Sequence, residues 1–295
     1  MTYKSKEFQS LVYGLLGVVG FSLTLPATRL ALVSFDPTFV GLGRALVAAA
    51  IAAAALWITH APWPVGRQWL RLGAVALGVV VGFPLFSSWA LARVHTSHAA
   101  VVIAVLPLVT ALFGAWLAAE RPSGIFWAAS IIASIVVTVF SLGSSGGTFE
   151  RADIALLAAV ITAGFGYAEG ARLARELGAW QTISWALLIS VPGIIVPVFD
   201  TFPEQLAAVQ WSSVAGFAYV SVVSMFLAFI AWYKALAMGG IARVGQIQLL
   251  QPFFTLAVAA LFMNEPVSGA QLGVAMIVLL CVYFGRKARV AVATN

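Results

Sequence analysis

The sequence has few charged residues and one cysteine. Charged side chains make up 9% of the 295 residues, whereas ordinary soluble proteins contain about 25%. Because a water-facing surface needs many more charges, the composition excludes a soluble globular protein. Cys281 stands alone, so neither a disulfide framework nor a cysteine metal site is possible by count.

The motifs of common catalytic sites are also missing. The sequence contains no H-E-x-x-H, no G-x-S-x-G and no clustered carboxylates, so an intramembrane enzyme would lack its reacting groups. The net charge of +6 is not gathered into a basic cluster with interleaved aromatics, which argues against nucleic acid as a partner. We expect no metal and no cofactor.

Hydrophobic residues are abundant: they make up 62% of the chain, and the mean hydropathy is +1.02. A helix crosses the bilayer core with about 20 apolar residues, and short connections leave no room for a separate soluble domain. The sequence predicts ten transmembrane helices, at residues 9–31, 38–59, 69–92, 97–118, 124–142, 153–173, 180–199, 212–237, 242–263 and 267–285.

The basic residues predict the orientation of these helices. The first apolar run is too long for a cleavable signal peptide and lacks a suitable cleavage site, so we expect it to be retained. With the N-terminus in the cytoplasm and ten spans, 12 of the 16 Lys and Arg residues lie inside. Since Lys and Arg collect in cytoplasmic loops, both termini are predicted to be cytoplasmic. The protein is then a multi-pass protein of the inner, cytoplasmic membrane, in contact with the lipid bilayer.

The two halves of the chain resemble each other. Pro107, Thr110 and Glu120 recur 145 residues later as Pro252, Thr255 and Glu265. Trp89-Ala90-Leu91-Ala92 matches Lys234-Ala235-Leu236-Ala237 in three of its four residues at the same offset.

The repeat predicts how the chain is divided. We expect a first five-helix repeat at 1–143, a linker at 144–150 and a second repeat at 151–295. A repeat with five spans enters the membrane from the opposite side in its second copy, which gives the inverted topology common in secondary transporters.

At these residues the chain resembles the EamA-type exporters of the drug/metabolite transporter superfamily. The resemblance lies in a fourth and a ninth helix that carry Pro107 and Pro252 and end in Glu120-Arg121-Pro122 and Glu265-Pro266. It covers about residues 5–290. It implies ten helices around a central cavity lined by helices 1, 3, 4, 6, 8 and 9, with helices 5 and 10 peripheral. Within the superfamily the chain looks most like the aromatic and amino-acid exporters.

Polar side chains inside a span are costly unless they face a cavity, and rings suit aromatic or branched solutes. Both kinds of residue also have a competing structural role: a polar side chain can form a hydrogen bond between helices, and a ring can pack in the core. The predicted cavity residues are Phe21, Ser22, Thr24, Phe83, Phe86, Ser87, Leu106, Phe165, Tyr167, Phe226, Gln248 and Gln251.

Other residues are predicted to bend helices or to act as a gate. Pro26, Pro107 and Pro252 each remove a backbone donor within a span. Glu169 and Arg172 share one helix face near the cytoplasmic end, where a gate or a structural ion pair is expected. Gly78/Gly82, Gly166/Gly170 and Gly269/Gly273 have the small-residue spacing of close helix contacts.

Arg44 has two interpretations. Near the start of the second span it could attract a substrate carboxylate, or its side chain could extend to the membrane interface. The sequence alone favours the interface.

The function predicted from these features is export of small metabolites, most simply aromatic or other apolar amino acids, by alternating access. A carrier of another metabolite or drug is the first alternative, and an intramembrane enzyme or a scaffold is the second. No acidic residue falls clearly at the centre of a span, so proton-coupled and facilitated transport both remain open. The small size permits a functional monomer.

Overall fold

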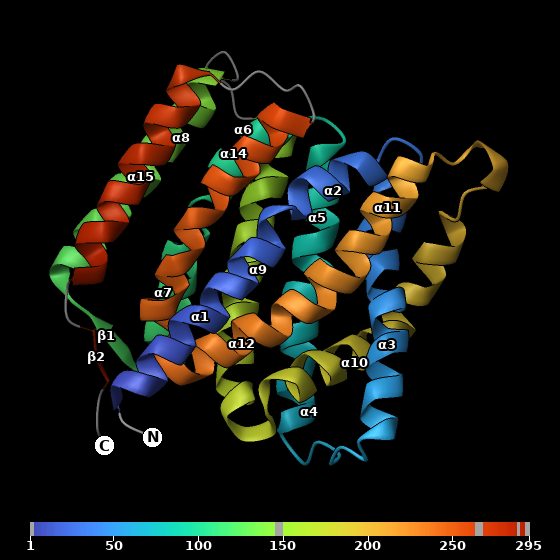
Figure 1. Cartoon of the computed structure of the whole chain (residues 1–295), viewed down its shortest axis with the longest axis horizontal. Coiled ribbons are helices and arrows are strands. Elements are labelled where there is room, and N and C mark those ends of the chain that lie inside the picture. Colours follow the sequence, from blue (N-terminus) through green and yellow to red (C-terminus); the bar gives the residue numbers. More distant parts are fainter. Residues whose placement is uncertain (1–2, 145–149, 263–267, 288–289, 293–295) are drawn as a thin grey trace.

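The computed structural model describes residues 3–144, 150–262, 268–287 and 290–292. These residues are almost wholly helical (Figure 1). In the first half the elements are α1 (Tyr3–Ser22), α2 (Thr24–Ala31), the π-helical η1 (Phe39–Gly43), α3 (Arg44–Ile58), α4 (Gln68–Val75), the π-helical η2 (Ala76–Gly82), α5 (Phe83–Leu91), α6 (Thr96–Ile103), α7 (Leu106–Leu117), β1 (Glu120–Pro122) and α8 (Gly124–Ser144).

The second half begins after the predicted linker, most of which lies outside the described residues. Its elements are α9 (Arg151–Leu177), α10 (Ala179–Asp200), the 3-10 helix η3 (Leu206–Ala208), α11 (Trp211–Tyr219), the π-helical η4 (Val220–Leu227), α12 (Ala228–Gly239), α13 (Ile241–Gly245), the 3-10 helix η5 (Gln246–Leu250), α14 (Gln251–Phe262), α15 (Gly269–Lys287) and β2 (Val290–Val292).

Consecutive helical pieces join into stretches that can cross a membrane. Within the described residues, eight such stretches are long and apolar enough: Lys6–Ala31, Phe39–Ile58, Gln68–Leu91, Thr96–Leu117, Arg151–Leu177, Ala179–Asp200, Trp211–Gly239 and Ile241–Phe262. They correspond to eight of the ten predicted spans.

The remaining two predicted spans coincide with α8 and α15. Both are helices, but their apolar stretches among the described residues are shorter, at Gly124–Ala133 and Gly269–Cys281. They pack against each other at one edge of the molecule (Figure 1).

Beside this pair, β1 and β2 form a short antiparallel ladder in which Glu120 lies opposite Val292. The sequence analysis predicted helices only. The ladder arises because α7 ends before Glu120 and Pro122 disfavours helix at the residue that precedes it.

The interruptions in the helices repeat between the halves. The turn at Ala104 and Val105 precedes α7, which begins Leu106-Pro107. In the second half η5 precedes α14, which begins Gln251-Pro252. A π-helical segment also lies in the third span and in its counterpart, Trp211–Gly239. Proline fits the first turn of a helix, where its missing N–H is not needed, so both prolines begin a new helical segment after a break.

Small residues allow α9 to lie very close to η2. A Cβ placed on Gly78 would lie 2.7 Å from the carbonyl oxygen of Thr162 and 2.9 Å from the Cα of Gly166. Gly170 similarly accommodates the ring of Tyr233. By contrast, no atom of the residues that the structure describes lies within 4 Å of the corresponding position at Gly269 or Gly273. The predicted close contact therefore involves the first two glycine pairs.

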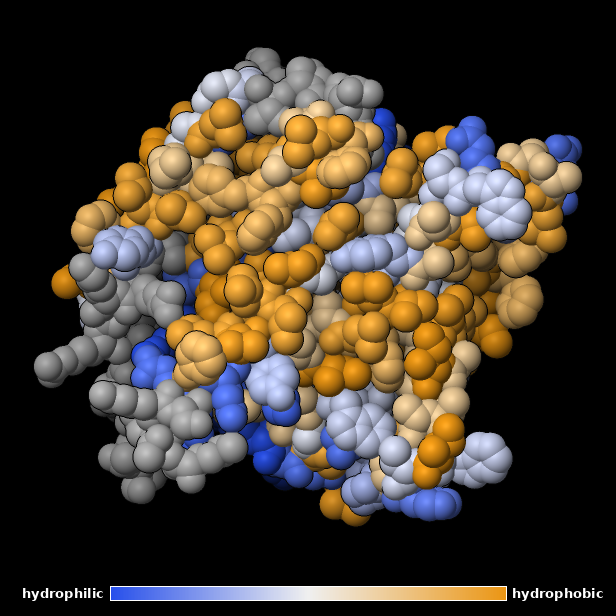
Figure 2. Space-filling view, in the orientation of Figure 1, coloured by the Kyte–Doolittle hydropathy of each residue, from blue (hydrophilic) through white to orange (hydrophobic). Residues whose placement is uncertain are grey.

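The surface matches a lipid environment. In Figure 2 hydrophobic residues cover the middle of the face shown, and hydrophilic residues gather toward its lower edge. Large hydrophobic side chains are exposed on many helices, among them Leu77, Ile132 and Leu261. An exposed apolar surface of this extent is stable in lipid, where it needs no cover.

Replacing Gly78 with alanine tests the close contact. The added methyl group would meet backbone atoms that cannot move aside, so we expect Gly78→Ala to lower the free energy of unfolding by about 1–3 kcal/mol. The measurement is unfolding in detergent micelles. Gly73→Ala is the matched control, because nothing lies within 4 Å of that position and alanine favours helix. Equal stability of the two variants would contradict the contact.

Candidate functional site

A narrow cavity lies between the two halves near the middle of the spans. Its free volume is about 10 Å³, which is room for about one water molecule. The cavity is therefore closed, and a solute of amino-acid size needs the surrounding helices to separate. It is lined by Phe21, Thr24, Arg44, Val79, Phe83, Leu106, Tyr167, Ser224, Met225, Phe229, Gln248 and Gln251.

Pro26 creates an unpaired carbonyl at this level of the first span. In a continuous helix the N–H of residue 26 would bond the carbonyl of Ser22, and proline has no N–H. The hydroxyl of Thr255 donates to that carbonyl at 2.8 Å. The side-chain amide of Gln251 donates to the neighbouring carbonyl of Phe21 at 3.4 Å. Polar side chains of α14 thus donate hydrogen bonds to the carbonyl groups at the break between α1 and α2. Such partners are required because the bilayer core contains no water.

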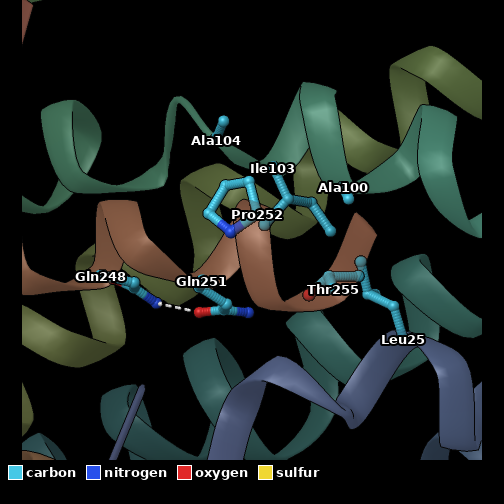
Figure 3. Close-up of a pocket in the computed structure, with 8 residues that line it drawn as sticks. All are labelled: Leu25, Ala100, Ile103, Ala104, Gln248, Gln251, Pro252 and Thr255. Carbon is cyan, nitrogen blue, oxygen red and sulfur yellow. Dashed lines mark hydrogen bonds between the residues drawn. The ribbon is translucent and has the colours of Figure 1, made fainter. Parts of the chain in front are cut away.

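The amide of Gln248 forms the polar centre of the cavity. Its nitrogen donates to the hydroxyl of Tyr167 at 3.4 Å and to the side-chain oxygen of Gln251 at 3.2 Å. Its own oxygen is buried and has no hydrogen-bond partner within the described part of the chain. Figure 3 shows Gln248 and Gln251 beside a second cavity that Leu25, Ile103 and Pro252 also line. An unused acceptor at this depth is available to a hydrogen-bond donor of a bound solute.

The rings of Phe21, Tyr167 and Phe229 pack together and line the cavity. Phe21 lies edge-on to Phe229, with 5.0 Å between the ring centroids, and its centroid is 6.2 Å from that of Tyr167. Trp232 stands behind them, 5.7 Å from Tyr167. These distances are typical of aromatic packing. An apolar or aromatic group in the cavity would contact the rings of Phe21 and Phe229.

Among the described residues that line this cavity, Arg44 is the only cation. Its side chain is 1% exposed, so the sequence-based preference for an interfacial position is wrong. The π-helical η1 begins the second span at Phe39, which places Arg44 more than one turn inside. Its Nε and Nη2 atoms have no hydrogen-bond partner, and no carboxylate in the described part of the chain pairs with it.

The structure brings together seven of the twelve predicted cavity residues: Phe21, Thr24, Phe83, Leu106, Tyr167, Gln248 and Gln251. Thr24 also pairs with Ser224, with 2.7 Å between the hydroxyl oxygens, which joins the first span to η4. The other five predicted residues do not line this cavity.

The hydroxyls of Ser22 and Ser87 bond carbonyls of their own helices, those of Val18 and Pro84. Phe165 packs edge-on against Phe113, with 5.4 Å between centroids. Phe226 is buried without lining the cavity. Phe86 is 36% exposed and lines a separate surface groove with Trp89 and Arg151.

The sequence analysis did not select Val79, Ser224, Met225 or Phe229. The repeat offset was a usable signal for two of them, because Val79 and Ser224 are 145 residues apart and both line the cavity. Leu106 and Gln251 are related in the same way. Applying the offset to every residue of the central helices would have paired these positions.

The predicted gate residues form an ion-pair network. Arg172 donates to Glu169 at 2.7 Å. Arg71, on α4, donates to the other oxygen of Glu169 and, at 2.6 Å, to Glu176. The network therefore joins the third span to α9 at the end where both meet the short connections.

Glu120 forms a further link between the halves. Its carboxylate accepts hydrogen bonds from the backbone N–H groups of Ile241 and Ala242, both at 2.7 Å. A carboxylate is favourable at the N-terminus of a helix, here α13, because the N–H groups there have no intrahelical partner. The counterpart Glu265 lies outside the described residues.

A double substitution tests the link between Pro26 and Thr255. Thr255→Val removes the hydroxyl that serves the Ser22 carbonyl, and we expect a loss of about 1 kcal/mol in unfolding free energy. In a Pro26→Ala background the carbonyl regains a helical donor, so the same change should cost less. Detergent unfolding of the four proteins gives the coupling. Thr162→Val is the control, since that hydroxyl bonds only its own helix. Additive effects would refute the link.

Comparisons with known proteins agree with this architecture. The EamA-like transporter family matches the chain twice, at residues 9–142 and 150–285. The chain is 43% identical over 283 residues, covering 96% of the chain and 99% of the relative, to the uncharacterized transporter YdeK of Bacillus subtilis (strain 168).

A more distant relative is named a probable terminal-alkyne amino-acid exporter, from Streptantibioticus cattleyicolor. Identity to it is 25% over 286 residues, covering 94% of the chain and 93% of the relative. A solved crystal structure shares the fold, with a TM-score of 0.72, 17% identity and coverage of 94% of the chain and 97% of that structure.

The relatives are transporters rather than enzymes, and the family fold consists of two repeats in a membrane. The family resemblance noted in the sequence is thereby confirmed. The chain belongs to the EamA-like transporter family and is a multi-pass membrane transporter.

Proposed function

We propose that the protein exports small metabolites, most simply aromatic or other apolar amino acids, across the cytoplasmic membrane by alternating access. The observation that carries this proposal is the closed cavity, which is lined by residues of both halves and combines unpaired polar atoms with an aromatic wall. A cavity used only for packing would be dry and apolar. Unused hydrogen-bonding groups beside rings suit an amphipathic solute.

The substrate class rests on two supports. The cavity is lined both by a cation and amide groups and by the rings of Phe21, Phe83 and Phe229. An amino acid with an apolar side chain combines polar and apolar groups in the same way. The distant relative named as an exporter of terminal-alkyne amino acids is the second support.

We propose further that the chain crosses the membrane ten times, with α8 and α15 as the fifth and tenth spans. The two repeats, 1–143 and 151–295, then have inverted topology, and both ends of the chain are cytoplasmic. The positive-inside count supports this orientation. So does the position of the start of α1 and of β2 at the same end of the molecule (Figure 1).

Alternating access then follows from the contacts at the two ends. On the proposed cytoplasmic side, Arg71, Glu169 and Arg172 tie α4 to α9. On the opposite side, His98 and Asp153 lie 2.7 Å apart and connect α6 to the start of α9. Opening one end while the other stays closed would expose the cavity to one side at a time.

Transport of labelled L-phenylalanine and L-leucine by the purified protein in proteoliposomes tests the proposal. We expect saturable flux, and a fall in kcat/KM of about fivefold in Tyr167→Phe, because Gln248 loses one hydrogen-bond partner. Gln251→Ala should reduce flux further while the protein still reaches the membrane. Gln205→Ala changes an exposed residue and is the control.

Absence of flux for amino acids, with flux of another metabolite or a cationic drug, would refute the substrate class. Unchanged kinetics in both cavity variants would refute the position of the site.

A further inference from the structure

Arg44 is a buried cation without a counterion in the described structure. Its side chain is 1% exposed, and its Nε and Nη2 atoms have no partner. The described carboxylates that form ion pairs use other cations: Glu7 contacts Arg243, and Glu169 and Glu176 contact Arg71. An unpaired charge away from water is strongly unfavourable. A partner that arrives from outside the chain would remove this cost.

Arg44 also has no basic counterpart at the equivalent position of the second half. The cavity residues Val79 and Ser224, and likewise Leu106 and Gln251, occupy equivalent positions in the two halves. The offset of 145 residues that relates the halves places Ile189 opposite Arg44. The cavity therefore has one guanidinium, contributed by the first half alone. A single cation neutralises a single negative charge.

The chemistry of the guanidinium narrows the choice of anion. Its planar N–H groups match the two oxygens of a carboxylate, which accept two parallel hydrogen bonds. A phosphate monoester has a charge near −2 at neutral pH, so one arginine would leave it partly unneutralised in an apolar site. Phe21, Val79 and Phe83 line the same cavity and would contact a hydrocarbon group attached to the carboxylate.

We propose that Arg44 binds the carboxylate of the transported solute, and that the substrates are small monocarboxylates with an apolar body. This inference rests on the proposed function and makes it more specific: in an amino acid the group held by Arg44 is the α-carboxylate. The α-ammonium group can then donate to the unpaired oxygen of Gln248.

Competition assays separate the carboxylate from the rest of the solute. Flux of labelled L-phenylalanine is measured in proteoliposomes against unlabelled L-phenylalaninamide, which lacks the carboxylate, and 3-phenylpropanoate, which lacks the amine. We expect 3-phenylpropanoate to inhibit and the amide to inhibit at least about 30-fold more weakly. In Arg44→Gln the KM for L-phenylalanine should rise by a similar factor. Arg44→Lys keeps the positive charge but loses the two parallel N–H donors, so its KM should lie between those of the wild type and Arg44→Gln.

Stability distinguishes binding from a structural role. Because Arg44→Gln removes an unpaired buried charge, we expect its unfolding temperature without ligand to equal or exceed that of the wild type. The stabilisation produced by 3-phenylpropanoate in the wild type should disappear. Arg93→Gln is the matched control, since Arg93 is exposed over the ring of Trp89 and away from the cavity. It should retain both flux and stabilisation.

The possible failures are distinguishable. Wild-type protein that moves no amino acid refutes the proposed function, and the stabilisation by 3-phenylpropanoate then decides the role of Arg44 independently. Amino-acid flux with unchanged KM in Arg44→Gln, or equal inhibition by the amide, overturns the inference. A large fall in stability of Arg44→Gln, with ligand stabilisation retained, shows a structural role and also overturns it.

Discussion

The hydrocarbon core of a bilayer contains no water to bond a free carbonyl, amide or charge, and the organisation of this protein follows from that constraint. Each interrupted helix needs a partner from another helix. The break at Pro26 is satisfied by Thr255 and Gln251 of the other half, and the start of α13 is satisfied by Glu120. Polar groups therefore collect where the two repeats meet, and those of Thr24, Gln248 and Gln251 line the cavity.

Two kinds of contact hold the halves together, and they differ in how easily they can change. Backbones lie almost in contact where Gly78 meets α9, and such packing tolerates little movement. The hydrogen bonds around Gln248 are long, at 3.2 and 3.4 Å, and can be exchanged for bonds to a solute. A transporter needs both properties: close packing, such as that of η2 against α9, which keeps those helices together as they move, and polar contacts elsewhere that are replaceable.

Much of this architecture was predictable from the sequence because the bilayer imposes strong patterns. Apolar runs of about 20 residues marked the spans, and rare residues such as Pro107 and Pro252 revealed the repeat. Gln248 and Gln251 could be selected because amides are costly in lipid. Phe86 and Phe226 could not be separated from the cavity aromatics, since rings occur equally in cores, at lipid surfaces and in binding sites. The position of Arg44 depends on the π-helical turn before it, which leaves no periodic signal. The ladder between β1 and β2 joins segments far apart in the sequence, so it could not be predicted from the sequence either.

Side-specific cysteine labelling tests most directly whether the two repeats cross the membrane in opposite directions and expose the cavity to each side in turn. A Cys281→Ser background has no other cysteine, so single cysteines at Ser5, Ser145 and Thr24 can be labelled with an impermeant thiol reagent in intact cells and in inverted vesicles. The account predicts labelling of Ser5→Cys from the cytoplasm only, of Ser145→Cys from outside only, and of Thr24→Cys from each side in turn. Labelling of the first two from the same side, or a Thr24→Cys that is unreactive from one side under all conditions, would contradict it.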